Sequence, residues 1–214
     1  MRDVRLVFSK LGLRRFVSHL DLNRAVLRCI RRTDIPIWYT EGFNPHPYVT
    51  FALPLPLGAE SVNDVMDIRV VGDIKNREIM EKLNAVLPEG LRITDCRNPV
   101  NKIRELTSAE YLFFFSEATD LADVKTIIDG GALTTEKPGK SHGRKVMKTV
   151  NLLEEIHAVS FDDAAKTMTI RLPAGSTKNV NPISLAEELE KTNGGIECAL
   201  VRRTNLYTDN GKFI

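Results

Sequence analysis

The chain has 214 residues, of which 43% are hydrophobic, enough for one large domain or two small ones with a buried core. The net charge is only +2, from 30 Lys and Arg against 28 Asp and Glu, so any attraction to nucleic acid must come from local patches. No apolar run approaches the roughly 20 residues that span a bilayer, so nothing in the sequence indicates a membrane.

The three cysteines, Cys29, Cys96 and Cys198, lie far apart, and none belongs to a C-x-x-C pair. This spacing provides no cage for zinc or an iron–sulfur cluster, so we expect no bound metal and no cofactor. Because the sequence shows no signal-peptide pattern, we expect reduced thiols and a cytoplasmic location.

The first predicted elements are a strand and a basic amphipathic helix. Residues 2–10 alternate apolar and polar side chains, which is the period of a half-buried strand. Ser18 and Asp21, in the order S-x-x-D, mark the start of a helix. Four arginines fall on the face opposite its apolar stripe, namely Arg24, Arg28, Arg31 and Arg32.

The rest of the first half continues in a recognisable order. The patterns predict strands at 36–40, 49–53 and 65–71, a helix at 76–87 and a strand at 91–96. Strand, helix, strands, helix, strand is the order of a ferredoxin-like α+β unit, which we assign to residues 1–98. Residues 99–107 are then interpreted as a linker.

The second half repeats this order. We predict strands at 111–116, 151–161, 167–173 and 196–207, and helices at 119–130 and 183–191. Asn181 and Pro182 supply the cap and first-turn signals of the last helix. We therefore predict an α+β fold of two tandem ferredoxin-like (βαββαβ) units, the second spanning residues 108–214.

Residues 39–56, YTEGFNPHPYVTFALPLP, combine polar side chains with four prolines. Pro45 and Pro47 restrict the backbone on either side of His46, which suits either a recognition loop or a rigid crossover between strands. The variety of polar groups favours function. The candidate residues here are Tyr39, Glu41, Gly42, Phe43, Asn44 and His46.

Two further basic features have alternative interpretations. The arginine face of the first helix is either solvated or, with aromatic neighbours, a surface for single-stranded nucleic acid. Residues 136–148, EKPGKSHGRKVMK, form a mobile basic hairpin loop in our interpretation, around His142, which either follows a phosphate backbone or is simply solvated.

A possible anion site precedes the last helix. Its residues, next to a helix N-terminus that favours negative charge, are Gly175, Ser176, Lys178 and Asn179. The segment lacks the spacing of a P-loop, so nucleotide hydrolysis is not indicated. His19, at the first position of the first helix, is either an acid–base group or a half-buried histidine bonded to a carbonyl.

Three sequence blocks carry a family resemblance: FVSHLDLNRAVLRCIRR, YTEGFNPHPYVTFALPLPLGAES and LPAGSTKNVNP. In their order and spacing the chain resembles, over nearly its whole length, the bacterial radical-SAM-linked proteins, also known as the DUF2344 domain. Thr40 stands where that family commonly has Ser. The resemblance implies a role beside a radical SAM enzyme. Since this chain has no C-x-x-x-C-x-x-C motif, the iron–sulfur chemistry would belong to that partner.

Three functions remain open. The first is a non-catalytic or accessory partner of a radical SAM enzyme that binds RNA or presents the substrate, in the modification of RNA or of a ribosome component. The second is a metal-independent ribonuclease, because tandem ferredoxin-like units resemble the RAMP superfamily of CRISPR-repeat-processing ribonucleases. His19, His46 and Tyr39 would then be the catalytic candidates. The third is a protein-only scaffold for the radical SAM partner.

Overall fold

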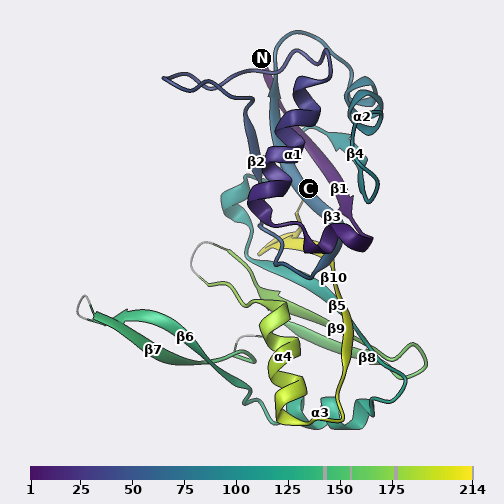
Figure 1. Cartoon of the computed structure of the whole chain (residues 1–214), viewed down its shortest axis with the longest axis vertical. Helices are drawn as coiled ribbons and strands as arrows, with labels where there is room; N and C mark the ends of the chain where they lie inside the picture. The colour runs from purple at the N-terminus through teal and green to yellow at the C-terminus, as the bar shows by residue number, and fades with distance from the viewer. Residues whose placement is uncertain (142–143, 155, 176–177, 214) are drawn as a thin grey trace.

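The computed structural model describes residues 1–141, 144–154, 156–175 and 178–213. Its strands form one nine-stranded, mostly antiparallel sheet and a separate two-stranded hairpin. Figure 1 shows an elongated molecule in which the N-terminal half of the chain lies above the C-terminal half. The predicted α+β fold is confirmed.

The first half has the topology of a ferredoxin-like unit. Its elements are β1 (Arg2–Lys10), η1 (Gly12–Phe16), α1 (His19–Arg31), β2 (Val49–Phe51), β3 (Glu60–Val70), α2 (Asn76–Asn84) and β4 (Leu91–Arg97). The strands run in the order β4-β1-β3-β2, and every neighbouring pair is antiparallel. Both helices contribute to one apolar core with β1 and β3, through Leu22 and Val26 of α1 and Ile79 and Leu83 of α2.

The second half repeats this topology with one insertion. Its elements are η2 (Ile103–Glu105), β5 (Ser108–Phe115), α3 (Leu121–Asp129), β8 (Ala158–Asp162), β9 (Thr167–Pro173), α4 (Pro182–Thr192), β10 (Cys198–Thr208) and β11 (Gly211–Lys212). The strand order β10-β5-β9-β8 corresponds to β4-β1-β3-β2 of the first half. The inserted hairpin, β6 (Thr134–Ser141) and β7 (Arg144–Asn151), lies between α3 and β8.

A short parallel pairing joins the two sheets. Arg202 of β10 pairs with Glu60 of β3, and Arg203 pairs with Ser61, so one edge of each unit is covered by the other. The chain end also returns to the first unit, where buried Phe213 lies 4.2 Å from the guanidinium of Arg5. The two units therefore share a continuous sheet.

The helix caps follow the sequence signals. Ser18 caps α1, because its side chain accepts a hydrogen bond from the backbone N–H of Asp21 at 3.2 Å. Asn181 caps α4 in the same way, accepting from the N–H of Ile183 at 3.0 Å. Among the described residues, no helix is long and apolar enough to cross a membrane.

The prediction that β1 is half-buried is wrong. Every residue from Val4 to Lys10 is buried, including Arg5. One face of β1 packs in the core with α1 and α2, whereas Val7 on the other face packs in the core of the second unit. Contact between the units thus buries the face that alternation alone assigned to solvent.

Three local predictions also need correction. Residues 36–40 form only isolated bridges, Ile37 with Val70 and Tyr39 with Pro47, because the segment leaves the sheet to enter a projecting hairpin. The strand expected from residue 151 begins at Ala158, since the Asn151 side chain accepts from two backbone N–H groups and turns the chain. Residues 136–141 and 144–148 belong to the paired strands β6 and β7 rather than to a long loop, and His142 lies outside the described residues.

Candidate nucleic-acid interface and junction cleft

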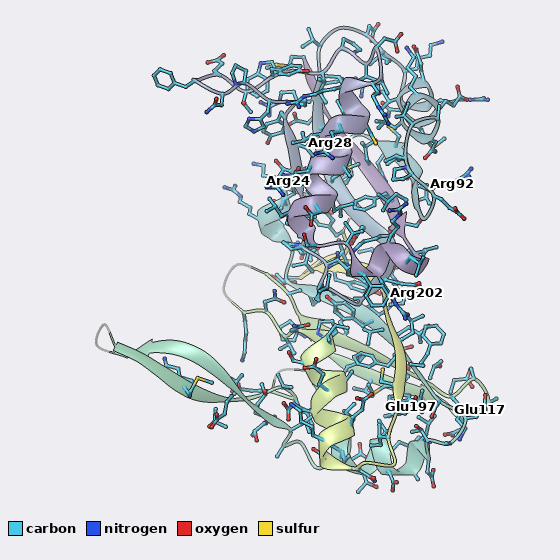
Figure 2. All side chains as sticks on the ribbon, in the orientation of Figure 1. Arg24, Arg28, Arg92, Glu117, Glu197 and Arg202 are labelled. Atoms are coloured by element: carbon cyan, nitrogen blue, oxygen red, sulfur yellow. The ribbon has the colours of Figure 1, made fainter. Side chains whose placement is uncertain are left out.

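The arginine face of α1 carries more positive than negative charge, because Asp21 is the acidic group that interacts with its arginines Arg24 and Arg28. Arg24, Arg28, Arg31 and Arg32 are all exposed. Arg24 forms an exposed pair with Asp21 at 3.3 Å, but the other three side chains make no ion pair or hydrogen bond with any described residue. By contrast, exposed Arg77 pairs with Glu81. Figure 2 shows Arg24 and Arg28 projecting outward from the helix, so this face is open to an anionic partner.

The EGFNPHP segment is the tip of a projecting hairpin (Figure 1). Residues 41–46 are exposed, and Gly42 has φ +120°, a conformation that favours glycine. The hairpin is closed by the hydrogen bond from the Thr40 N–H to the His46 carbonyl at 2.9 Å. Nδ1 of His46 lies 3.1 Å from both Thr40 Oγ1 and the Asn44 carbonyl oxygen. The imidazole is therefore oriented by the loop itself.

Aromatic and cationic side chains hold the base of this hairpin. The rings of Trp38 and Tyr48 meet edge to face with their centroids 5.7 Å apart. The Arg69 guanidinium lies 5.3 Å from the Trp38 ring and 4.6 Å from the Tyr48 ring, and its Nε donates to Asp3 at 2.6 Å. These contacts attach the hairpin to β3, while Phe43 at the tip is fully exposed.

The two candidate histidines lie at opposite ends of α1. His19 is its first residue, and its ring packs edge to face on Phe51 with a centroid distance of 5.0 Å. His46 belongs to the hairpin that follows the other end of the helix, and a helix of 13 residues is roughly 20 Å long. Burial lowers the pKa of His19, although nearby Asp64 opposes the shift. Exposed Tyr39 lies in the same hairpin as His46, where it pairs with Pro47, but His19 is at the other end of α1, so the three candidates do not form one acid–base site.

Two cavities open where the two units meet. One of about 240 Å³ is lined by Pro54, Leu55, Pro56, Tyr111, Asn179 and Asn181. The other, of about 300 Å³, shares Pro54 and Asn179 with the first and also touches Gly175 and Arg104. We call this pair of cavities the junction cleft. It brings together the ALPLP end of residues 39–56 and the segment before α4, which the sequence analysis treated separately.

A buried polar cluster lies next to the junction cleft. Arg203 is fully buried, and its Nη2 donates to Asp64 and, at 2.8 Å, to the Leu53 carbonyl oxygen. Lys10 is also buried, and its amine donates to the Val17 carbonyl oxygen at 2.9 Å. Burial lowers the pKa of Lys10, with Asp64 acting in the opposite direction.

The cluster has more positive than negative charge. Lys10 and Arg203 face one carboxylate, Asp64. The Nε and Nη1 atoms of Arg203 make no close hydrogen bond in the described part of the chain, although Tyr111 interacts with the guanidinium. Burial also raises the pKa of Tyr111, and Arg203 partly offsets that rise. The sequence analysis missed this cluster, although Arg203 lies two residues from buried Val201 in a strand, a position that alternation directs inward.

The segment before α4 is used mainly to build the junction. A Cβ atom at Gly175 would lie 2.9 Å from the Leu106 carbonyl oxygen, so close backbone packing explains the glycine. Lys178 pairs with Glu154 at 3.3 Å. Asn179 is exposed at the rim of the junction cleft, whereas Ser176 lies outside the described residues.

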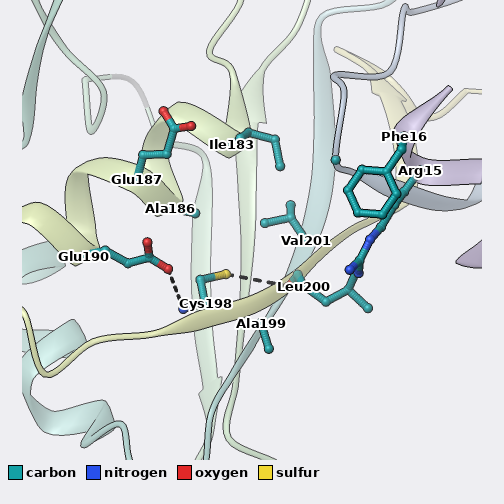
Figure 3. A pocket seen from close by; sticks show the side chains of 11 residues that line it. Arg15, Phe16, Ile183, Ala186, Glu187, Glu190, Cys198, Ala199, Leu200 and Val201 are labelled. Atoms are coloured by element: carbon teal, nitrogen blue, oxygen red, sulfur yellow. Dashed lines mark hydrogen bonds between the residues drawn. The ribbon is translucent and has the colours of Figure 1, made fainter. Parts of the chain in front are cut away.

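A third cavity, of about 200 Å³, lies between η1 and α4 (Figure 3). Phe16 and Arg15 approach it from the first unit, and Ile183 and Glu187 approach it from α4. The Glu190 carboxylate accepts a hydrogen bond from the Cys198 N–H at 2.8 Å on its lower side. Neither here nor elsewhere among the described residues is a group of three or more His, Cys, Asp or Glu side chains arranged to hold a metal ion.

Fold and surface together define a protein of two ferredoxin-like units with a basic helix face and a cleft at their junction. More specifically, the chain belongs to the family described as "Uncharacterized protein conserved in bacteria (DUF2344)", whose model matches residues 3–182. No curated protein matches the chain.

One similar solved structure is a chain of the "Crystal Structure of a Cbf5-Nop10-Gar1 Complex", with 8% identity and a TM-score of 0.45. The match covers 98% of this chain but only 50% of the chain in the complex, so this chain spans about half the length of that protein. At this level of similarity, no functional argument rests on it.

Proposed function

We propose that the protein is an accessory RNA-binding partner of a radical SAM enzyme, to which it presents single-stranded RNA or a ribosome component in the cytoplasm. The observation that carries the proposal is the arginine face of α1. Arg31 and Arg32 are exposed without an acidic partner among the described residues, and the single carboxylate of Asp21 faces both Arg24 and Arg28. Arginines near a helix C-terminus also complement the helix dipole, but that effect does not require so many. A phosphate backbone supplies the missing negative charge.

Two projecting arms support an extended ligand. Figure 1 shows the EGFNPHP hairpin of the first unit and the β6–β7 hairpin of the second projecting to the same side of the molecule. The sequence of the second arm includes Lys137, Lys140, Arg144, Lys145 and Lys148. Phe43 at the tip of the first arm offers an exposed ring on which a base can stack.

A separate apolar surface supports a protein partner. Leu13, Phe16, Leu20 and Leu57 are exposed large apolar side chains around η1 and the first turn of α1. The hydrogen bond from the Gly58 N–H to the Arg15 carbonyl at 2.9 Å connects the turn after Leu57 to η1. Exposed apolar surface of this kind is common at protein–protein contacts. We assign it to the radical SAM enzyme.

The ribonuclease alternative has less support. Metal-independent cleavage of RNA needs an acid and a base on either side of one phosphate. His19 and His46 lie at opposite ends of α1, so they cannot act on the same phosphate. Tyr39 shares the hairpin of His46, but the hydrogen-bond contacts of the imidazole are with Thr40 and Asn44 rather than with Tyr39. A protein-only scaffold would leave the unpaired arginines without a role.

The RNA proposal is tested by comparing two double variants with the same change of charge. Arg28→Ala/Arg31→Ala removes part of the α1 face, whereas Arg77→Ala/Arg92→Ala removes two exposed arginines on α2 and β4. Figure 2 shows Arg92 away from Arg28. Anisotropy titrations of a labelled single-stranded RNA at several salt concentrations give the salt slope. We expect the first variant to reduce the slope by about 1.4, at roughly 0.7 for each lost phosphate contact, and the second to leave it unchanged. Equal behaviour of the two variants, or no RNA binding by the wild type, contradicts the proposal.

The partner proposal has its own test. Leu13→Asp/Phe16→Asp should abolish capture of the radical SAM enzyme from the same host, whereas Val100→Asp, at another exposed apolar position, should not. If the wild type captures no such enzyme, the partner part of the proposal is wrong even if RNA binds.

A further inference from the structure

We propose that the junction cleft is a nucleobase pocket, which holds one unstacked base of the bound RNA. This inference deepens the proposed function and rests on it for the identity of the ligand. The pocket is formed by both units: Pro54, Leu55 and Pro56 come from the first, and Tyr111, Asn179 and Asn181 come from the second.

The walls of the junction cleft suit a flat ring. The rings of Pro54 and Pro56 are rigid and apolar, and Leu55 between them is buried. The two cavities, of about 240 and 300 Å³, share Pro54 and Asn179. Together they fall within the size range of small-ligand pockets, roughly 300–1,000 Å³. Bases removed from a stack are commonly held between apolar or aromatic side chains.

Two amides offer hydrogen bonds to a base edge. The side chain of Asn179 makes no hydrogen bond with any described residue. Asn181 uses its Oδ1 to cap α4, and within the described part of the chain its NH₂ group has no acceptor. A carboxamide presents a donor beside an acceptor, which matches the hydrogen-bonding edges of nucleobases.

The buried cluster behind Tyr111 adds positive charge beside the pocket. Lys10 and Arg203 outnumber Asp64, and Arg203 also interacts with Tyr111, which lines the pocket. Base edges carry carbonyl oxygens and ring nitrogens, which a positive environment attracts. Exposed Arg104 at the second cavity is placed for a flanking phosphate.

The position of the junction cleft agrees with this assignment. In Figure 1 the junction of the two units, where the cleft opens, lies between the levels at which the two arms project. An RNA strand that contacts both arms would therefore pass the junction.

The test uses nucleoside monophosphates and a short single-stranded RNA as separate probes. Asn179→Ala removes the free amide, and Asn179→Trp fills the cleft. Asn210→Ala is the control, at another exposed asparagine outside the cleft. We expect both Asn179 variants to weaken monophosphate binding roughly tenfold or more, at about 1–3 kcal/mol for a well-placed amide–base pair. The salt slope for RNA should stay unchanged, because no phosphate contact is lost.

The possible outcomes separate the two proposals. If RNA binds with its arginine-dependent salt slope but both Asn179 variants bind monophosphates like the wild type, the pocket inference is wrong and the proposed function stands. If monophosphates bind in an Asn179-dependent way but RNA does not bind, the pocket stands and the RNA function is wrong. If the wild type binds neither probe, both are wrong. Thermal unfolding of each variant checks that the fold is intact.

Discussion

Replacing Asp64 by Ala should destabilise the protein more than any surface charge change. The substitution leaves Arg203 and Lys10 buried with no carboxylate between them. Breaking a buried ion pair by removing one partner typically costs about 3–5 kcal/mol, because the remaining charge stays desolvated. For a chain of this size, the midpoint of thermal unfolding should fall by about 6–20 °C.

The assay is urea unfolding at constant pH, followed by circular dichroism. Asp163→Ala is the matched control, because its pair with Lys125 lies at the surface. That variant should lose no more than about 1 kcal/mol of unfolding free energy.

A second variant isolates the electrostatic cause. Asp64→Leu/Arg203→Met replaces both partners of the pair by apolar side chains and should recover much of the stability lost by Asp64→Ala. The reasoning is refuted if Asp64→Ala unfolds within about 1 kcal/mol of the wild type, the size of a surface effect. It is also refuted if the double variant is as unstable as the single one.

Three further predictions follow from local geometry. Burial lowers the pKa of His19, so the folded state disfavours protonation of its imidazole. The neutral imidazole therefore contributes its full stability above the ordinary histidine pKa of about 6.5, and this contribution is lost as the pH falls below that value. His19→Phe should therefore flatten the fall in unfolding free energy between about pH 7 and 5, and an unchanged fall would contradict this assignment. Gly90→Ala should lower the free energy of unfolding by at least about 1 kcal/mol, because φ is +81° and the new Cβ would lie 2.8 Å from the Leu11 carbonyl oxygen. Gly194→Ala is the control, because a Cβ there meets nothing within 4 Å. Equal unfolding midpoints for these two variants would show that the steric argument is wrong. Burial raises the pKa of Cys96 and Cys198 to about 12, so few of these thiols are thiolates at pH 8 in the folded protein. Iodoacetamide at pH 8 should therefore label them quickly only in urea, and fast labelling of Cys96 or Cys198 in the native protein would contradict the raised pKa.

Local patterns in the sequence determined most of the elements. The S-x-x-D signal at Ser18 and the Asn181–Pro182 pair marked two helix starts correctly, because capping depends on side chains only a few residues from the backbone groups they bond. The four arginines of α1 were placed on the outer face for a similar reason, since helical periodicity alone separates them from Leu22 and Val26. The order of these elements was enough to predict two ferredoxin-like units.

Contacts distant in sequence decided what local patterns could not. Nothing near Lys10 indicates that its amine is buried, because the residues that cover it and share its charge, Asp64 and Arg203, lie in strands of both units. Pro54 and Asn179 are separated by more than half the chain, yet they line the same cavities. Only the pairing of β3 with β10 fixes these neighbours, since the position of one unit against the other depends on the packing of whole sheets and not on any local periodicity.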